Sequence, residues 1–531
     1  MSTHWLADAH PETFWPHHTW PNFAALSKTA KTRASVVLPI HGFADHGLGL
    51  PLDAEEAVGS AVLRRAAEIA TASEAATRLR ILPPLRFGLA PYPSTHFGID
   101  AETASEQMRE IVQSVKAAGF GKIVFFNTSP WNEELTATVA LDTHVEFGLS
   151  NHVVNLPKLG MSFHPAAPRE ARANAQAAAA HALGLTAKQV RANLKKSAKP
   201  DVRDADFRPG NFQQPEPLAP DETLEGATIL EMAAMQLARA FAGVSQASKP
   251  AGLKGSSASS LLPETESRLE ACDTFPQSYR SHYLPAFTAA QLAALPAKSR
   301  ARSLVIIPTG AIEQHGPHLP VGVDAILGQA WLAHALPKLF SKTPRAAQRV
   351  FIAPPITFGK SNEHDGFAGT ITISAQTLRR VLLALATHLR ALDFRAIAVL
   401  NTHGGNSPTI VHTLREIQTT LNLRAGMLKP PLSSDLSAKE AALGIHAGEW
   451  ETALMLACAP ELVRMDKAVC EYPARPLDGV ASVAWMTRDV SKSGVMGNAR
   501  AATAAKGKSW LEKASTALAG RIGELLELLE S

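Results

Sequence analysis

Cysteine is scarce in this chain of 531 residues, and the three that occur have no CxxC spacing: Cys272, Cys458 and Cys470. An odd number of cysteines without that spacing argues against a disulfide framework and against a zinc site built from thiolates. An excess of one charge is also missing, because 52 Lys and Arg face 48 Asp and Glu and leave a net charge of +4. Without a cluster of basic residues, nucleic acid is not an expected partner.

Long apolar runs are absent as well. Nowhere do 18 apolar residues follow one another, and the N-terminal stretch MSTHWLADAHPETFW lacks the apolar core of a signal peptide. We therefore expect a cytoplasmic protein with no membrane partner. What the chain does have is an ordinary globular composition, 46% hydrophobic and 19% charged. Its length suffices for two or three domains of roughly 150 residues each.

Two segments of the chain share one plan. When Val36 to Pro39 is set against Val305 to Pro308, His46 falls opposite His315 without a gap. Each segment continues into a helix with apolar residues three and four apart, near 105–118 and 375–392, and then into a second apolar strand. Strands that alternate with helices indicate a mainly parallel sheet covered on both faces. The sequence therefore predicts an α/β fold with two α/β/α domains.

The repeats also suggest the domain boundaries. We expect a first domain over residues 1–245, a linker rich in Ser, Gly and Lys over 246–268, and a second domain over 269–531. Residues 165–220 have no evident counterpart in the second half, so they are interpreted as an insertion in the first domain.

The densest group of polar side chains lies in the segment IEQHGPHLPVGVD. Glu313 and His315 alternate along an extended stretch and so face the same side, and Asp324 follows nine residues after His315. His403 comes directly after the apolar strand AIAVLNT, and the carboxyl end of a strand is where α/β proteins bind ligands. A carboxylate and an imidazole that face one centre are typical metal ligands.

A third loop, IHAGEWETALMLA, carries His446, Glu449 and Glu451 just before an apolar helix. Buried carboxylates in this number require cations, and two divalent ions could hold a bridging hydroxide between them. One histidine alone would more often be structural, but five candidate ligands together favour a metal site. Ser407 and the cysteines have no adjacent base, so nucleophilic catalysis is the weaker interpretation.

Four of these motifs, EQHGPHLPVGVD, EHDGFAGT, NTHGGN and HAGEWETALMLA, resemble the successive motifs of the creatininase (creatinine amidohydrolase) family. The resemblance covers residues 275–531 and implies a metal-dependent amidohydrolase with an α/β/α fold and a dinuclear zinc or manganese centre. It further implies that a hydroxide bridging the two ions attacks the carbonyl of a small cyclic or linear amide, whose C–N bond is then hydrolysed. The substrate would thus be a small molecule.

The resemblance also assigns roles to residues. By motif position, one ion would be held by Glu313, Asp324 and His403, and the other by His315, Asp324 and Glu451. His446 would stand behind these ligands or polarise the substrate. Glu449 is a candidate proton shuttle, although an acid at the start of a helix is also explained by the helix dipole. His364 could reach the site or fix its own loop.

One position of the second half departs from the family pattern. Creatinine-hydrolysing members carry a glutamate two residues after the histidine that matches His403, and here that position is Gly405. The alternatives are therefore a formamide deformylase or a peptide-processing hydrolase. From a different class, a catalytically silent scaffold of two pseudo-enzyme domains also remains open.

The N-terminal half keeps the plan but has lost most ligand types. Ala44 and Ser129 stand where the second half has Glu313 and His403, and two potential ligands remain at matching positions: His46 and Glu55. We interpret this half as a degenerate, metal-free copy; the alternative is a different site rebuilt from His41, Asp45 and Asp53. A fused pair could supply the contacts of a dimer, so we expect a homo-oligomer, a trimer of two-domain chains, or a lone pseudodimer.

Overall fold

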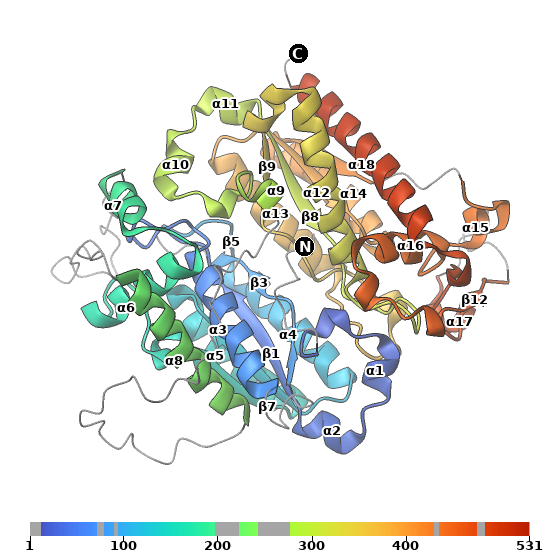
Figure 1. The fold of residues 1–531 in the computed structure, drawn as a ribbon, viewed down its shortest axis with the longest axis horizontal. Coiled ribbons are helices and arrows are strands. Elements are labelled where there is room, and N and C mark those ends of the chain that lie inside the picture. The colour runs from blue at the N-terminus through green and yellow to red at the C-terminus, as the bar shows by residue number, and fades with distance from the viewer. Residues whose placement is uncertain are drawn as a thin grey trace.

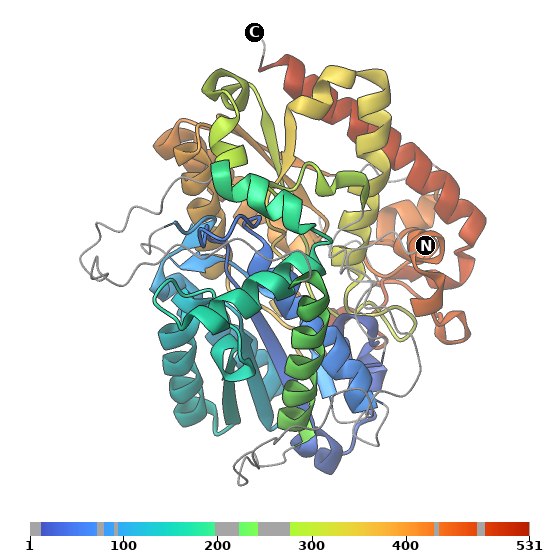
Figure 2. The same ribbon diagram turned by 60° about the vertical axis from the view of Figure 1, so that its left-hand side comes forward.

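The structure is a computed structural model that describes residues 12–71, 79–89, 94–196, 222–242, 277–429, 435–474 and 484–529. Each half of the chain forms a parallel sheet flanked by helices, and the two halves lie against each other (Figures 1 and 2). The expected linker over 246–268 falls outside the described residues. Within the described part, no helix is long and apolar enough to cross a membrane.

The two sheets have the same strand order, which confirms the internal repeat and the α/β fold. The first runs β2 (Leu79–Ile81), β1 (Ser35–His41), β6 (Lys122–Asn127), β7 (Ser150–Asn155), with β3 (Leu85–Arg86) also paired to β1. The second runs β9 (Val350–Ile352), β8 (Leu304–Thr309), β10 (Ala396–Asn401), β11 (Arg424–Leu428). All of these pairs are parallel, and the registers agree, because Val36 pairs with Ile123 as Val305 pairs with Ile397.

Both faces of each sheet are covered, because alternate strand residues enter opposite cores. In the first half, Val37 and Phe126 lie in one hydrophobic core while Val36 and Leu38 lie in the other. One face carries α3 (Ala54–Thr71), α6 (Arg169–Ala182) and α8 (Glu222–Ala242), and in the second half α12 (Val323–Lys342), α16 (Glu449–Cys458) and α18 (Ala504–Glu527). The opposite face carries α4 (Ala101–Ala117) and α5 (Glu133–Phe147), and in the second half α13 (Ala375–Ala391) and α14 (Ser407–Leu421).

The expectation that residues 165–220 lack a counterpart is wrong for its first helix. α6 packs against both α3 and α8, as α16 packs against both α12 and α18. The sequence concealed this match because α6 is an alanine-rich helix without the His and Glu residues of the loop before α16. The following helix, α7 (Ala187–Lys196), lies over the loop after β1, where Asn193 donates to the carbonyl of Gly49 at 3.1 Å.

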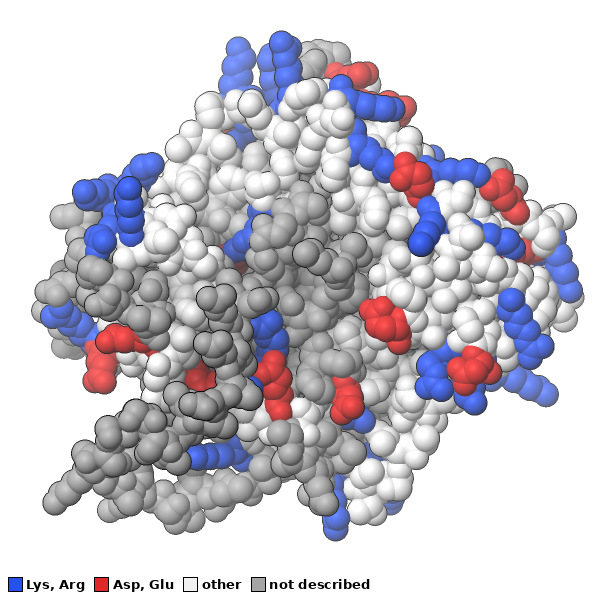
Figure 3. Space-filling model, viewed as in Figure 1, with Lys and Arg blue, Asp and Glu red and all other residues white. Residues whose placement is uncertain are grey.

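The two halves meet along α4 and α13 and through short elements at the start of each half. The short elements at the start of the first half are η2 (Trp15–His17), α1 (Trp20–Ala24) and α2 (Lys28–Arg33), and those at the start of the second are α9 (Gln277–Arg280), η8 (Leu284–Ala286), α10 (Ala289–Ala294) and α11 (Ala297–Ala301). Near the C-terminus lie α15 (Ala438–Leu443), α17 (Thr487–Val490) and the pair β12 (Cys470–Glu471) and β13 (Gly497–Asn498). On the face seen in Figure 3, Lys and Arg are interspersed with Asp and Glu over the described surface.

Candidate metal centre

Two neighbouring strands in the middle of the second sheet carry the candidate ligands at their carboxyl ends. β8 ends at Thr309, four residues before Glu313, and β10 ends at Asn401, two residues before His403. Gly316, at φ +70°, turns the chain directly after His315. Parallel strands deliver their ends to one edge, so residues distant in sequence converge there.

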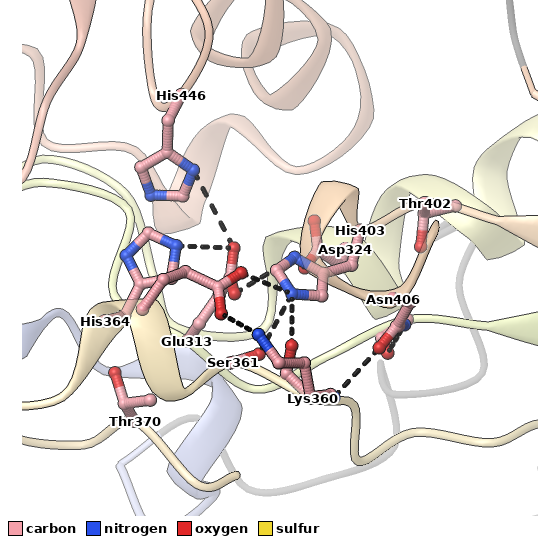
Figure 4. A network of polar contacts seen from close by, with 12 residues as sticks. Glu313, Asp324, Lys360, Ser361, His364, Thr370, Thr402, His403, Asn406 and His446 are labelled. Carbon is pink, nitrogen blue, oxygen red and sulfur yellow. Dashed lines mark hydrogen bonds and ion pairs between the residues drawn. The ribbon is translucent and has the colours of Figure 1, made fainter. Parts of the chain in front are cut away.

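Glu313 stands at the centre of this cluster (Figure 4). Its carboxylate oxygens lie 3.0 Å from His403 Nδ1, 3.5 Å from His364 Nε2 and 3.7 Å from His446 Nδ1. Asp324, in the first turn of α12, lies 3.5 Å from His315 Nε2 and 3.6 Å from His403 Nδ1. All of these side chains are buried. Four of the sequence-predicted ligands, Glu313, His315, Asp324 and His403, thus lie together with two further imidazoles.

The partners of the outer ring nitrogens fix which nitrogen of each histidine carries the proton. His315 Nδ1 lies 3.0 Å from the carbonyl of Glu313, His403 Nε2 lies 3.0 Å from the carbonyl of Lys360, and His446 Nε2 lies 2.7 Å from the carbonyl of Gln314. A carbonyl only accepts, so these nitrogens donate, and the other nitrogen of each ring faces the carboxylates, where it offers a lone pair to a cation once its proton is displaced. This is the arrangement that metal-binding histidines adopt.

His364 is oriented the other way. Its Nδ1 accepts from the side-chain amide of Gln314 at 2.9 Å, so its Nε2 carries the proton and faces Glu313. We therefore distinguish His364, which turns an N–H toward a candidate ligand, from the three histidines whose inner nitrogen can bind a cation. The sequence had left open whether His364 reaches the site; the structure places it there.

The cluster fits divalent cations. Three of its buried atoms make no hydrogen bond: Glu313 Oε2, His315 Nε2 and Asp324 Oδ2. Buried polar atoms without hydrogen bonds are costly, and a cation among them would satisfy all three. Four groups of three potential ligands each have donor atoms within 4.8 Å of one another: Glu313, His364 and His446; His315, His446 and Glu451; Glu313, Glu363 and His403; and Glu313, His315 and Asp324.

The protonation of the cluster points the same way. Burial raises the pKa of Glu451 to about 7, against the opposing charge of His315. Burial lowers the pKa of His315, but the carboxylates of Asp324, Glu451 and Glu313 outweigh it and raise that pKa to about 9. Near neutral pH the metal-free cluster therefore holds protons where cations would bind, and metal binding must displace them.

Of the three candidate residues in the segment IHAGEWETALMLA, two lie in the cluster and one does not. His446 and Glu451 belong to one potential ligand group with His315, and the backbone N–H of Ala447, a residue at φ +50°, donates to Glu451. Glu449 does not join them, because its carboxylate binds Lys506 outside the cluster. Its role as a proton shuttle stays a prediction, without geometric support.

Sequence reasoning missed Glu363. Its carboxylate lies 3.4 Å from His403 Nε2 and 3.1 Å from Lys360 Nζ, and its side chain is 15% exposed, at the edge of the buried cluster. A Cβ atom at Gly405 would collide with Glu363 Oε1 and with His403 Nε2, so the glycine makes room for this carboxylate. The signal was present in the sequence as the acid beside His364, but a loop of unknown shape did not show where it points.

The equivalent place in the N-terminal half is filled by its own side chains. His46 Nε2 lies 2.8 Å from Glu55 Oε1, and the ring of His46 stacks on Phe163 at 4.8 Å. Glu55 also accepts from the backbone N–H of Gly42 at 2.7 Å. The residues of the alternative site diverge: His41 bonds Thr128, Asp45 bonds its own loop, and Asp53 pairs with Arg280.

Comparison with known proteins agrees with this geometry. The sequence pattern of the creatininase family, described as creatinine amidohydrolase, matches residues 16–192 and again 287–522. This chain belongs to the creatininase family. Both halves are thus creatininase domains, and the second carries the ligand-type residues.

Individual creatininase relatives differ in what they are named for. The chain is 33% identical over 212 residues, 38% of this chain and 78% of the relative, to a mycofactocin precursor peptide peptidase of Mycobacterium ulcerans (strain Agy99). It is 28% identical over 250 residues, 42% of this chain and 89% of the relative, to a creatinine amidohydrolase of Pseudomonas putida. A solved structure named "Creatininase Mn" is 22% identical, with a TM-score of 0.39, over 46% of this chain and 98% of that one. The family and the two sequence relatives, a peptidase and an amidohydrolase, support a hydrolase.

Proposed function

We propose that this protein is a metal-dependent amidohydrolase whose C-terminal half binds two divalent ions, Zn²⁺ or Mn²⁺, and cleaves a C–N bond. The observation that carries the proposal is the set of three buried atoms without hydrogen bonds, on Glu313, His315 and Asp324. In our assignment Asp324 bridges, one ion adding Glu313 and His403 and the other adding His315 and Glu451. Bound there, the ions would polarise an amide carbonyl and activate a water molecule.

The surrounding residues have separate tasks in this proposal. His446 turns a lone pair into the site, where it would accept a hydrogen bond from the substrate and help to polarise it. His364 Nε2 faces Glu313 at 3.5 Å and would hold that carboxylate in place. Glu363, at the half-buried edge, would carry a proton to the departing nitrogen. We prefer it to Glu449, whose carboxylate is engaged by Lys506.

A peptide is our second candidate substrate, beside small cyclic amides and formamides. Two observations favour it: the 33% identity to a peptide-processing relative, and Gly405 at the position where creatinine-hydrolysing members have a glutamate. The same metal chemistry would cleave each of these bonds, so the pocket rather than the ions would select among them.

The test is metal content per chain, measured by elemental mass spectrometry on protein purified without chelators. Two ions in the wild type and almost none in a Glu313→Ala, Asp324→Ala double variant would support the proposal and justify a hydrolysis screen of cyclic amides, formamides and short peptides. Near-zero metal in the wild type, even after zinc and manganese are added back, would favour the silent scaffold.

We also propose that the two fused creatininase domains replace a dimer of single domains. The chain would then assemble as a trimer of two-domain chains or remain a lone pseudodimer. Light scattering tests this directly, because a hexamer of full-length chains would contradict it.

A further inference from the structure

The start of each half crosses over to the other half, and these crossings obey one pattern. In the N-terminal half we call residues 13–26 the N-terminal arm. The backbone N–H groups of Val321 and Gly322 donate to its carbonyls at His18 and Pro16, at 2.8 and 2.9 Å. The equivalent bonds on the other side run from Leu52 and Asp53 to Phe287 and Pro285, at 3.0 and 2.9 Å. The halves are therefore joined by a reciprocal exchange of arms about a pseudo-twofold axis.

The first loop that the N-terminal arm contacts carries two candidate ligands. Val321, which donates to the arm, also accepts from the backbone N–H of Glu313 at 2.9 Å. Gly322, which donates as well, is the N-cap of α12, so Asp324 follows it in the first turn. The arm is thus one further hydrogen bond from the backbone of Glu313, and it binds the chain two residues before Asp324.

The second loop carries Glu363 and His364. Trp15 Nε1 of the arm donates to the carbonyl of Gly369 at 2.8 Å, and the Trp20 ring packs edge-on against Phe367 with centroids 5.4 Å apart. Phe367 and Gly369 lie three and five residues after His364. The orientation of this loop decides whether His364 faces Glu313.

The third loop that the arm contacts follows α17 and includes Ser493 and Gly494. Figures 1 and 2 both show the dark-blue α1 beside these orange-red elements. Trp20 Nε1 donates to the carbonyl of Ser493 at 3.0 Å. The next residue, Gly494, accepts from the Gln314 amide at 3.0 Å, and the same amide donates to His364. A single tryptophan therefore reaches a network that touches two histidines of the cluster.

The two exchanged arms differ at the two positions where the N-terminal arm has tryptophan. Trp15 and Trp20 of the N-terminal arm correspond to Leu284 and Ala289 in the reciprocal arm, which packs on the half without the ligand set. Leucine and alanine side chains have no N–H to donate. The additional hydrogen bonds are thus present only where the arm faces the candidate metal centre, and symmetry alone does not account for them.

We infer that the degenerate half serves the metal centre of the other half, because its N-terminal arm holds two loops that carry residues of the cluster and a third loop that is bonded to Gln314 between them. Trp15 and Trp20 are positioning residues in this arrangement. They touch no ligand and act through Gly369 and Ser493 on the geometry of the cluster. The inference rests on the proposed metal centre and adds the reason why a half with so few ligands is retained.

The experiment compares metal affinity in full-length variants by chelator competition, with zinc and then manganese as the probe. The Trp15→Phe, Trp20→Phe double variant keeps two large aromatic rings but loses both N–H donors, so the fold should persist. Leu284→Val, at the position equivalent to Trp15 in the reciprocal arm, is the matched control. We expect the metal dissociation constant of the double variant to be roughly tenfold higher, as for other groups that orient ligands, and that of Leu284→Val to match the wild type.

Two results would overturn the inference. A dissociation constant within twofold of the wild-type value would show that the arm does not set ligand geometry, and an equal rise in Leu284→Val would show only general loosening. A single Trp20→Phe variant, whose ring is half-buried, replaces the double variant if that one fails to fold. A wild type that binds no metal would instead refute the proposed function, so the two failures are distinguishable.

Discussion

Replacing Asp324 with asparagine should separate metal binding from folding. Asp324 is buried, and burial raises the pKa of its carboxyl in the metal-free protein, with a further rise from Glu313. The metal-free fold thus favours a neutral side chain at this position, and the asparagine amide supplies one of the same shape. We expect the metal-free variant to melt no lower than the metal-free wild type.

The effect should appear when metal is added. An ion present at 100 times its dissociation constant stabilises the folded state by about 2.7 kcal/mol. For a half of this size, each kcal/mol corresponds to a rise of about 2–4 °C in Tm, so saturation should raise the wild-type Tm by about 5–11 °C. Asp324→Asn should lose nearly all of this rise, which differential scanning calorimetry with and without zinc or manganese would measure.

The N-terminal half provides the control at the matching position. Glu55 is fully buried and accepts from Gly42 and His46, so Glu55→Gln weakens charge-assisted bonds worth about 1.5–3 kcal/mol each. That variant should melt lower than the wild type but keep the full metal-dependent rise. Asp324→Asn with an intact rise, or Glu55→Gln without one, would refute the assignment of the metal centre to the C-terminal half.

Three further predictions concern the same cluster. Metal affinity should rise by about tenfold per pH unit between pH 7 and 9, because His315, with a pKa near 9, must lose its proton on binding. Below pH 7 the affinity should change more steeply with pH, because Glu451 is protonated too. Calorimetric titration at several pH values would show a flat profile if no proton is displaced. Gly405→Ala should weaken metal binding by roughly tenfold because its Cβ would displace Glu363 or His403, whereas Gly404→Ala, with open space around its Cβ, should not; equal affinities would contradict this. Glu363→Gln should lower kcat by about 10²-fold or more with metal content unchanged, and Glu449→Gln by less than tenfold; the reverse order would return the proton-transfer role to Glu449.

Much of the fold follows from the sequence because its signals are local. The apolar strands at Val36 and Val305, and the helices with apolar residues three and four apart, are patterns within a short window. The observed bounds, such as α13 at Ala375–Ala391, lie close to the expected 375–392. The match between α6 and α16 was missed because packing position, unlike a motif, leaves no trace in residue identity.

The candidate site divides in the same way. Glu313, His315, Asp324 and His403 stand in motifs whose spacing already indicates a common centre. Glu363 was not foreseen, because only the folded loop turns its carboxylate toward His403. The contacts of Trp15 and Trp20 join residues more than 350 positions apart, and no local pattern encodes such a distance.

The pairing of His46 with Glu55 has a consequence for the history of this chain. The place that matches the candidate metal centre is filled by side chains. The Phe163 ring stacks on the imidazole of His46, and the carboxylate of Glu55 is bound by Gly42 and His46. Restoring glutamate at Ala44 and histidine at Ser129 would therefore not reopen it while Phe163 stays in place. Each substitution that reintroduces a ligand would have to fit into a packed core before any metal could bind. After a duplication, side chains that fill the unused site make the recovery of metal binding unfavourable, so that copy is left with a supporting role.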